Sequence, residues 1–214
     1  MGVVVEMNIG VLGGTFDPVH NGHLIVAEEV KTRLNLVEII FVPAGQPWLK
    51  AERPISPAEH RLQMLRLAIA DKPYFKLSSI EIERTGPSYT VDTITELRGQ
   101  LGSEDELFFI LGWDSLAELP QWREPSRLIK MCYLVAVPRP GYPRPKLKAL
   151  EVIIRGLSQR VMLMKKPEID ISASAIRDRV AQGLSIRHLV PGPVDRYIKQ
   201  HGLYTNLSIK YLGS

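Results

Sequence analysis

Short, continuously apolar runs alternate with longer amphipathic stretches along this chain. Strands are expected within residues 7–14, 37–45, 106–114, 127–145 and 161–172. Apolar residues at helical spacing predict helices within residues 22–36, 56–73, 90–102, 172–183 and 192–204. Strands without a polar face, separated by helices, are typical of a parallel sheet that is covered on both sides. The pattern therefore predicts a single α/β domain, a Rossmann-like doubly wound parallel sheet with helices on both faces.

The ends of the predicted helices carry local signals. Ser56, Pro57 and Glu59 match the N-cap, N1 and N3 positions of a capping box that opens one helix. Gly102 is expected to end the third helix, and Gly202 is expected to cap the last one. In a doubly wound sheet, ligands bind beyond the carboxyl ends of the strands, so the residues that follow each strand are the first candidates for a site.

Composition narrows the class of protein. With 45% hydrophobic and 23% charged residues among 214, the chain matches one globular domain over 1–214. The sequence leaves open whether the chain starts at Met1 or at Met7, in which case residues 1–6 are an N-terminal extension, and 205–214 are treated as a C-terminal tail. The net charge of +4 is scattered, which suits a small phosphorylated ligand. A nucleic-acid-binding module is not expected, because basic residues and aromatics form no concentrated stripe.

The same composition predicts a cytoplasmic protein without a membrane partner. No apolar run approaches the roughly 18–20 residues of a transmembrane helix. The N-terminal segment lacks the basic region of a signal peptide and continues directly into the first strand. The single cysteine, Cys132, lies in the apolar run "MCYLVAV" and is expected in the core.

The stretch "GGTFDPVHNGHLIVAEEV" (13–30) carries the first candidate chemistry. Its glycine pair lets a ligand approach the backbone, and the helix beginning near Asn21 directs free N–H groups toward an anion. His20 and His23, at i and i+3, project to the same side and can donate hydrogen bonds to phosphate oxygens. A structural zinc pair is not expected, because Cys132 is the only thiol. Histidines of no functional consequence are the other alternative.

A second block, "ISASAIRDRV" (171–180), opens a later helix. Ser172 and Ser174 lie at the helix start, where hydroxyls and free N–H groups meet anions, and Arg177 follows one turn later. The alternative is an ordinary N-cap with an arginine that points outward.

These two blocks resemble signatures of the nucleotidyltransferase superfamily. "GGTFDPVHNGH" resembles its H-x-G-H motif, and "ISASAIRDRV" resembles its I-S-x-[ST]-x-x-R motif. The segments "GPSYTVDTITELR", "ILGWDSLAELPQW", "VAVPRPGYP" and "HGLY" are similar to the bacterial nicotinate mononucleotide adenylyltransferase family, so the resemblance covers nearly the whole chain. It implies transfer of AMP from ATP to nicotinate mononucleotide, with deamido-NAD and pyrophosphate as products, in NAD biosynthesis.

The resemblance also implies roles for individual residues. His20 and His23 would be the catalytic phosphate clamps. The implied ATP-binding residues are Gly13, Gly14, Thr15, Phe16, His20, His23, Lys50, Gly112, Asp114, Ser172, Ser174 and Arg177. The implied mononucleotide-binding residues are Tyr89, Thr90, Trp122 and Arg139. Mg²⁺ would be held mainly by the ATP phosphates, without a protein metal site.

Several of these roles have structural alternatives. Asp114, implied to bind the ATP ribose, could instead cap a helix, and Trp122, implied to stack on the nicotinate ring, could be a half-buried core residue. Asp17 is expected to brace the turn. The chain also departs from the family's usual Pro-Pro-His-Lys run, since in "GQPWLK" (45–50) Trp48 and Leu49 replace a Pro and the His, while Lys50 keeps the basic position.

Alternative functions stay open at this point. One is transfer to another phosphorylated acceptor, such as nicotinamide mononucleotide or phosphopantetheine, and another is a non-catalytic nucleotide sensor on the same fold. A homo-oligomer is also left open by the sequence.

Overall fold

The computed structural model describes residues 7–46, 55–102 and 104–205. The strands are β1 (Asn8–Gly14), β2 (Glu38–Pro43), β3 (Phe75–Leu77), β4 (Glu106–Gly112), β5 (Tyr133–Val137) and β6 (Val161–Leu163). The α-helices are α1 (Asn21–Arg33), α2 (Ala58–Ile69), α3 (Ile80–Glu83), α4 (Thr90–Gly99), α5 (Trp113–Ala117), α6 (Pro125–Met131), α7 (Leu147–Ile153), α8 (Ala173–Ala181) and α9 (Gly192–Gln200). Two 3₁₀ turns are η1 (Leu119–Gln121) and η2 (Leu157–Gln159).

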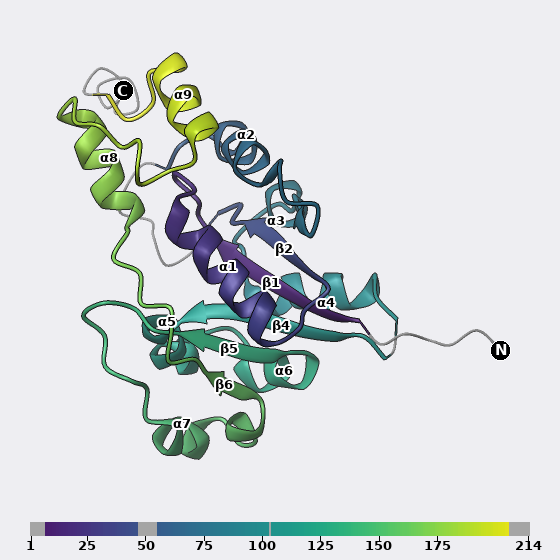
Figure 1. The fold of residues 1–214 in the computed structure, drawn as a ribbon. Helices are drawn as coiled ribbons and strands as arrows, with labels where there is room; N and C mark the ends of the chain where they lie inside the picture. The colour runs from purple at the N-terminus through teal and green to yellow at the C-terminus, as the bar shows by residue number, and fades with distance from the viewer. Residues whose placement is uncertain (1–6, 47–54, 103, 206–214) are drawn as a thin grey trace.

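The described strands form one parallel sheet in the order β3-β2-β1-β4-β5-β6 (Figure 1). Every neighbouring pair in this order is parallel. The chain moves outward from β1 in one direction through β3 and then restarts on the other side at β4. This reversal places the switch point between the carboxyl ends of β1 and β4, where doubly wound folds bind ligands. The predicted fold class is confirmed.

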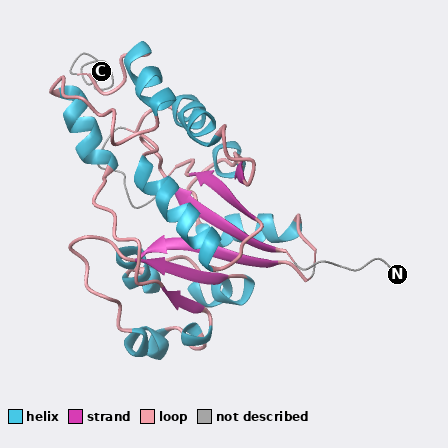
Figure 2. Ribbon diagram, viewed as in Figure 1, coloured by secondary structure: helices cyan, strands magenta, loops and turns pink. Residues whose placement is uncertain are grey.

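Helices cover both faces of this sheet (Figure 2). Successive side chains of a strand point to opposite faces, and in β1 Val11 enters one buried cluster while Leu12 enters the other. Residues of α1, α2, α8 and α9 share the cluster of Leu12, whereas residues of α4, α5, α6 and α7 share that of Val11. Cys132 is buried in the second cluster, as expected. In the described part of the chain, no helix has both the length and the apolar character needed to span a bilayer.

Two predicted helix boundaries are wrong. The N-cap of α2 is Pro57 rather than Ser56, and no side chain caps this helix. Ser56 instead donates its N–H to Asp17, so a tertiary contact has replaced the predicted capping box. Helix α4 ends at Gly99 instead of Gly102, because the N–H of Gly102 turns to the Asp105 carboxylate at 2.9 Å. Gly202, with a φ of 59°, follows the end of α9 as predicted.

The sequence pattern missed several short elements. Strand β3 has three residues, and α3, α5, α6 and α7 have between four and seven. A helix of two turns or fewer is too short to show a 3.6-residue period, so its formation depends on tertiary packing rather than on pattern.

Candidate active site

The turn from β1 into α1 brings the first predicted block to the carboxyl end of the sheet. Strand β1 ends at Gly14, and Phe16 turns the chain with a φ of 51°. Helix α1 begins at Asn21, as the sequence predicted, and His20 is its N-cap residue. Phe16 is buried beneath this turn, and its ring contacts that of His23 edge-on, with centroids 4.9 Å apart.

The two histidines of the block lie against each other. Their rings stack with centroids 3.6 Å apart, and the backbone N–H of His20 donates to His23 Nδ1 at 3.2 Å. This bond leaves the Nε2 of a neutral His23 as the protonated nitrogen. His20 is 6% exposed. Its pKa is lowered to about 4, mainly by burial and further by the charge of the nearby Arg139 guanidinium. The His20 ring is therefore available near neutral pH as an uncharged hydrogen-bonding group.

Gly22 makes this arrangement possible. A Cβ atom at this position would lie 2.8 Å from Ile169 Cγ2 and 3.0 Å from His20 Nδ1. The helix start can approach the segment that leads to α8 only because residue 22 has no side chain.

Helix α8 brings the second predicted block to the first. The Ser172 hydroxyl caps the helix by accepting from the Ala175 N–H at 3.2 Å. Arg177 donates from Nη1 to the Asp17 carbonyl at 2.6 Å and from Nη2 to the Ser174 hydroxyl at 3.3 Å. Ser172 is thus a true N-cap, but the alternative of an outward-pointing arginine does not hold. The two blocks, 160 residues apart in sequence, meet at the turn before α1.

The ends of β4 and β5 add a charged pair beside this turn. Arg139, two residues after β5, donates to Asp114 Oδ2 at 2.5 Å. Helix α5 begins at Trp113 with Gly112 as N-cap, so Asp114 lies within the first turn and caps nothing with its side chain. Its other oxygen, Oδ1, is buried without a hydrogen-bond partner among the described residues, and the same holds for His20 Nδ1. Buried polar atoms are rarely left in this state, and those at an active site commonly await a ligand.

A second group of predicted residues lies at the start of α4. Tyr89 is the N-cap residue and Thr90 the first residue of the helix, as expected. The Asp92 carboxylate lies 3.6 Å from Arg123, whose guanidinium also covers the Tyr89 ring at 4.8 Å. Trp122 is partly buried and meets the Phe109 ring at 6.1 Å, so the packing alternative holds, although its Nε1 has no hydrogen-bond partner in the described residues.

Three residues support the site through contacts that the sequence did not predict. Ser88 accepts from the N–H groups of Gly45 and Gln46 and so joins the end of β2 to the start of α4. Arg61 is 2% exposed and binds backbone carbonyls around the turn before α1. Tyr204, in the recognised "HGLY" segment, donates to Asp17, which confirms that Asp17 braces the turn.

A sequence signal for Arg61 did exist. Arg61 occupies the apolar stripe of its helix, since Met64, Leu65 and Ala68 follow it at i+3, i+4 and i+7. A charge at a core position indicates a buried partner.

Some predictions remain outside these groups. Lys50, together with the Trp48-Leu49 departure, lies outside the described residues.

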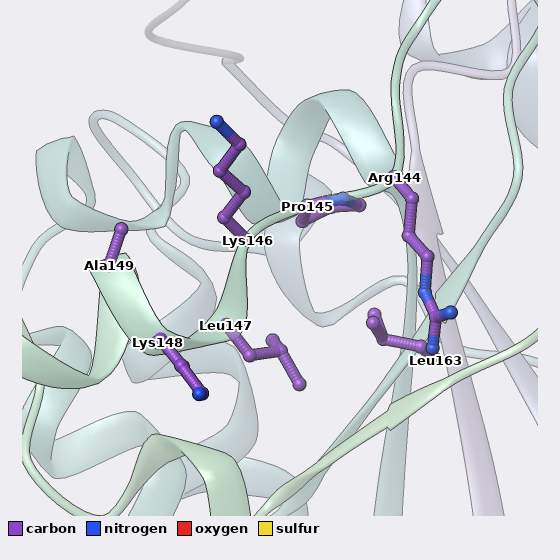
Figure 3. A pocket seen from close by; sticks show the side chains of 7 residues that line it. All are labelled: Arg144, Pro145, Lys146, Leu147, Lys148, Ala149 and Leu163. Carbon is purple, nitrogen blue, oxygen red and sulfur yellow. The ribbon is translucent and has the colours of Figure 1, made fainter.

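A hollow of about 500 Å³ on the surface is lined by Arg144, Pro145, Lys146, Leu147, Lys148, Ala149 and Leu163. Figure 3 shows its Arg144 side chain running toward Leu163. None of these lining residues was predicted for the site.

Within residues 7–46, 55–102 and 104–205, no three His, Cys, Asp or Glu side chains gather as a metal site would require.

Known proteins resemble this chain along nearly its full length. A sequence model of the cytidylyltransferase-like family matches residues 11–179. A probable nicotinate-nucleotide adenylyltransferase of Dehalococcoides mccartyi is 53% identical over 201 residues, which cover 94% of this chain and 98% of that protein. Another, from a Roseiflexus species, is 50% identical and covers 92% and 97%, respectively.

Solved structures agree at the level of the fold. The Plasmodium falciparum nicotinic acid mononucleotide adenylyltransferase complexed with NaAD has a TM-score of 0.77 and 20% identity, covering 94% of this chain and all of that one. At this low identity the likeness concerns architecture alone, whereas the bacterial relatives are close enough to show the family. The chain belongs to the cytidylyltransferase-like family and, within it, to the nicotinate-nucleotide adenylyltransferases.

Proposed function

We propose that this protein transfers AMP from ATP to nicotinate mononucleotide, releasing pyrophosphate and forming deamido-NAD for NAD biosynthesis. The observation that carries the proposal is the contact between Arg177 and the Asp17 carbonyl at 2.6 Å. It unites both phosphate-facing blocks at the sheet's switch point. Family membership supports the choice of ATP and nicotinate mononucleotide as substrates.

The reaction we propose is a direct displacement. The 5′-phosphate of the mononucleotide attacks the α-phosphorus of ATP in line, and pyrophosphate leaves with the electrons of the broken P–O bond. A phosphate nucleophile is already ionised near neutral pH, so the protein needs no general base. Catalysis then consists of positioning and charge stabilisation. His20 and His23 donate hydrogen bonds to the reacting phosphate. Arg177 neutralises charge on the phosphates that leave, and the Ser174 hydroxyl can hydrogen-bond to them.

Each substrate is proposed to bind at one of the two residue groups. The free Oδ1 of Asp114 would accept a hydrogen bond from an ATP ribose hydroxyl, next to the glycines and main chain of residues 13–16. Nicotinate mononucleotide would place its carboxylate at the N-terminus of α4, at Tyr89 and Thr90, with Trp122 beside the pyridine ring. Arg139, which contacts Asp114 and whose charge acts on His20, would help to hold the mononucleotide.

The finer features of the proposal follow from chemistry. ATP is proposed to enter as its magnesium complex, with the metal held mainly by phosphate oxygens. A cytoplasmic location stays a prediction, and the sequence leaves the oligomeric state open. A non-catalytic nucleotide sensor is disfavoured, since it would have no need for stacked histidines and an arginine converging on one phosphate site.

An assay of pyrophosphate release tests the proposed function. Purified protein is mixed with MgATP and, in separate reactions, nicotinate mononucleotide, nicotinamide mononucleotide or phosphopantetheine. Turnover that requires nicotinate mononucleotide is expected. Release only with phosphopantetheine, or none with any acceptor, contradicts the proposal.

A further inference from the structure

The turn between β1 and α1 has a backbone conformation that needs outside support. Phe16, a bulky residue, has a φ of 51°, in the left-handed region that such residues seldom adopt. Backbone conformations of this kind persist where surrounding contacts hold them in place. The same turn offers main-chain groups of Thr15 and Phe16 to the proposed phosphate site and continues to His20. The contacts that hold the turn therefore decide where the phosphate-facing groups lie.

Tyr204 holds this turn from the far end of the described chain. Its hydroxyl donates to Asp17 Oδ1 at 2.6 Å, and the other carboxylate oxygen, Oδ2, accepts from the Ser56 N–H at 3.2 Å. Tyr204 is 9% exposed and Asp17 is 4% exposed. Burial and the Asp17 carboxylate raise the pKa of Tyr204 far above its usual value, so its hydroxyl keeps the proton and remains a donor.

Arg61 holds the same turn from α2. Its Nη1 donates to the carbonyl of Thr15 at 3.0 Å and to that of Ala44 at 2.7 Å, and its Nε donates to the carbonyl of Ser56 at 3.0 Å. One planar guanidinium thus joins the segments that follow β1 and β2. Its fork of donors is suited to several fixed carbonyls at once, which the point charge of a lysine is not.

These contacts converge on the turn between β1 and α1 and are not spread through the hydrophobic core. Asp17 receives Tyr204 through its carboxylate and Arg177 through its carbonyl, so the last described segment and α8 meet at one residue. Thr15, two residues earlier, is held by Arg61. A network that only satisfied buried polar groups would have no reason to converge on these two residues of the turn.

We infer that Tyr204 and Arg61 are positioning residues for adenylyl transfer, acting through Asp17 and Thr15 on the turn that carries the phosphate-facing groups. This inference rests on the proposed function. Neither side chain is assigned a contact with substrate. Because small displacements of reacting groups cost rate more than binding, the loss of either contact is expected to lower kcat and to leave KM nearly unchanged.

The test begins with Tyr204→Phe, which removes only the hydroxyl. We expect kcat to fall about tenfold, while KM for MgATP and for nicotinate mononucleotide stays within about threefold of the wild-type value. All assays are run well below the Tm of each variant, so that loss of folded protein does not contribute. Arg61→Lys, which keeps the charge but removes the fork, is expected to give the same split and serves if Tyr204→Phe does not fold.

Leu157→Ala is the matched control. Leu157 is fully buried in the cluster on the opposite face of the sheet, so its truncation lowers Tm without touching the turn. Its kcat is expected to equal that of the wild type. An equal fall in kcat for this control, or an unchanged kcat in both Tyr204→Phe and Arg61→Lys, contradicts the inference.

A second readout separates this inference from the proposed function. Hydrogen exchange of the amides between Thr15 and Val19 is expected to become about tenfold faster in Tyr204→Phe and to stay unchanged in Leu157→Ala. If the wild-type protein releases no pyrophosphate with any acceptor, the proposed function fails, and the exchange rates alone decide the positioning role. Unchanged exchange in Tyr204→Phe contradicts that role whatever the activity.

Discussion

The stacked imidazoles of His20 and His23 give the first test at the scale of single residues. If His23 donates to charge that develops in the transition state, His23→Ala should lower kcat by about 10²-fold or more, with a much smaller change in KM for ATP. Ile25→Ala is the control, because Ile25 lies on the same helix with 44% of its surface exposed. Steady-state kinetics measure both variants. A His23→Ala enzyme with nearly normal kcat removes His23 from the mechanism.

Burial of His20 predicts a pH dependence of stability. Its folded-state pKa of about 4 lies below the unfolded value of 6.5, so between these values the unfolded chain binds more protons than the folded one. The free energy of unfolding should therefore decrease as pH falls from 6.5 to 4, by about 3 kcal/mol from this residue alone.

The measurement is urea unfolding of the wild type and His20→Gln across this pH range. The variant should lose less stability in acid than the wild type. Parallel curves for the two proteins contradict a buried, neutral His20.

Helix α1 depends on a close approach at its first turn. Gly22→Ala places a Cβ within 2.8 Å of Ile169 Cγ2, which should cost about 1–3 kcal/mol of stability and lower kcat by displacing His20. Gly99→Ala, at the end of α4, is the control, since its Cβ meets nothing within 4 Å. That change should be neutral or slightly stabilising. Thermal unfolding and pyrophosphate release compare the two, and equal effects contradict the account of α1.

The elements also show where sequence reasoning succeeds. The segments of β1, α1 and β4 were predictable, because strands buried on both faces are continuously apolar and a helix packed on a sheet repeats apolar residues at helical spacing. The capping box at Ser56 was wrong because the bond from its N–H to Asp17 comes from a residue 39 positions away, which no local pattern contains. Short elements such as β3 and α6 were not predicted, because they depend on tertiary packing that no local pattern contains.

At the scale of the whole molecule, some features of the candidate site could be predicted from the sequence and others could not. The two blocks containing His20 and Arg177 were predictable because each has local chemistry at a helix start. The meeting of these blocks at Asp17, the pair of Asp114 with Arg139, and the carbonyl partners of Arg61 were not predictable, since each contact joins segments that only the folded sheet brings together.

The choice between nicotinate and nicotinamide mononucleotide as acceptor depends on the charges around the start of α4. Nicotinate and nicotinamide mononucleotides differ only in a carboxylate against a carboxamide. The start of α4 offers N–H donors and positive potential, which favour the carboxylate. Asp92 could oppose this preference, but its carboxylate lies 3.6 Å from the Arg123 guanidinium, which offsets its charge.

The most direct test of the account is therefore kcat/KM for the two mononucleotides, measured side by side with MgATP and the same enzyme. A charge-assisted hydrogen bond exceeds a neutral one by roughly 1–2 kcal/mol, and an amide turned toward donors leaves some of them unpaired. We expect nicotinate mononucleotide to be preferred by a factor on the order of 10² or greater. Equal values, or a preference for nicotinamide mononucleotide, would contradict the assigned substrate and the role of α4 in choosing it.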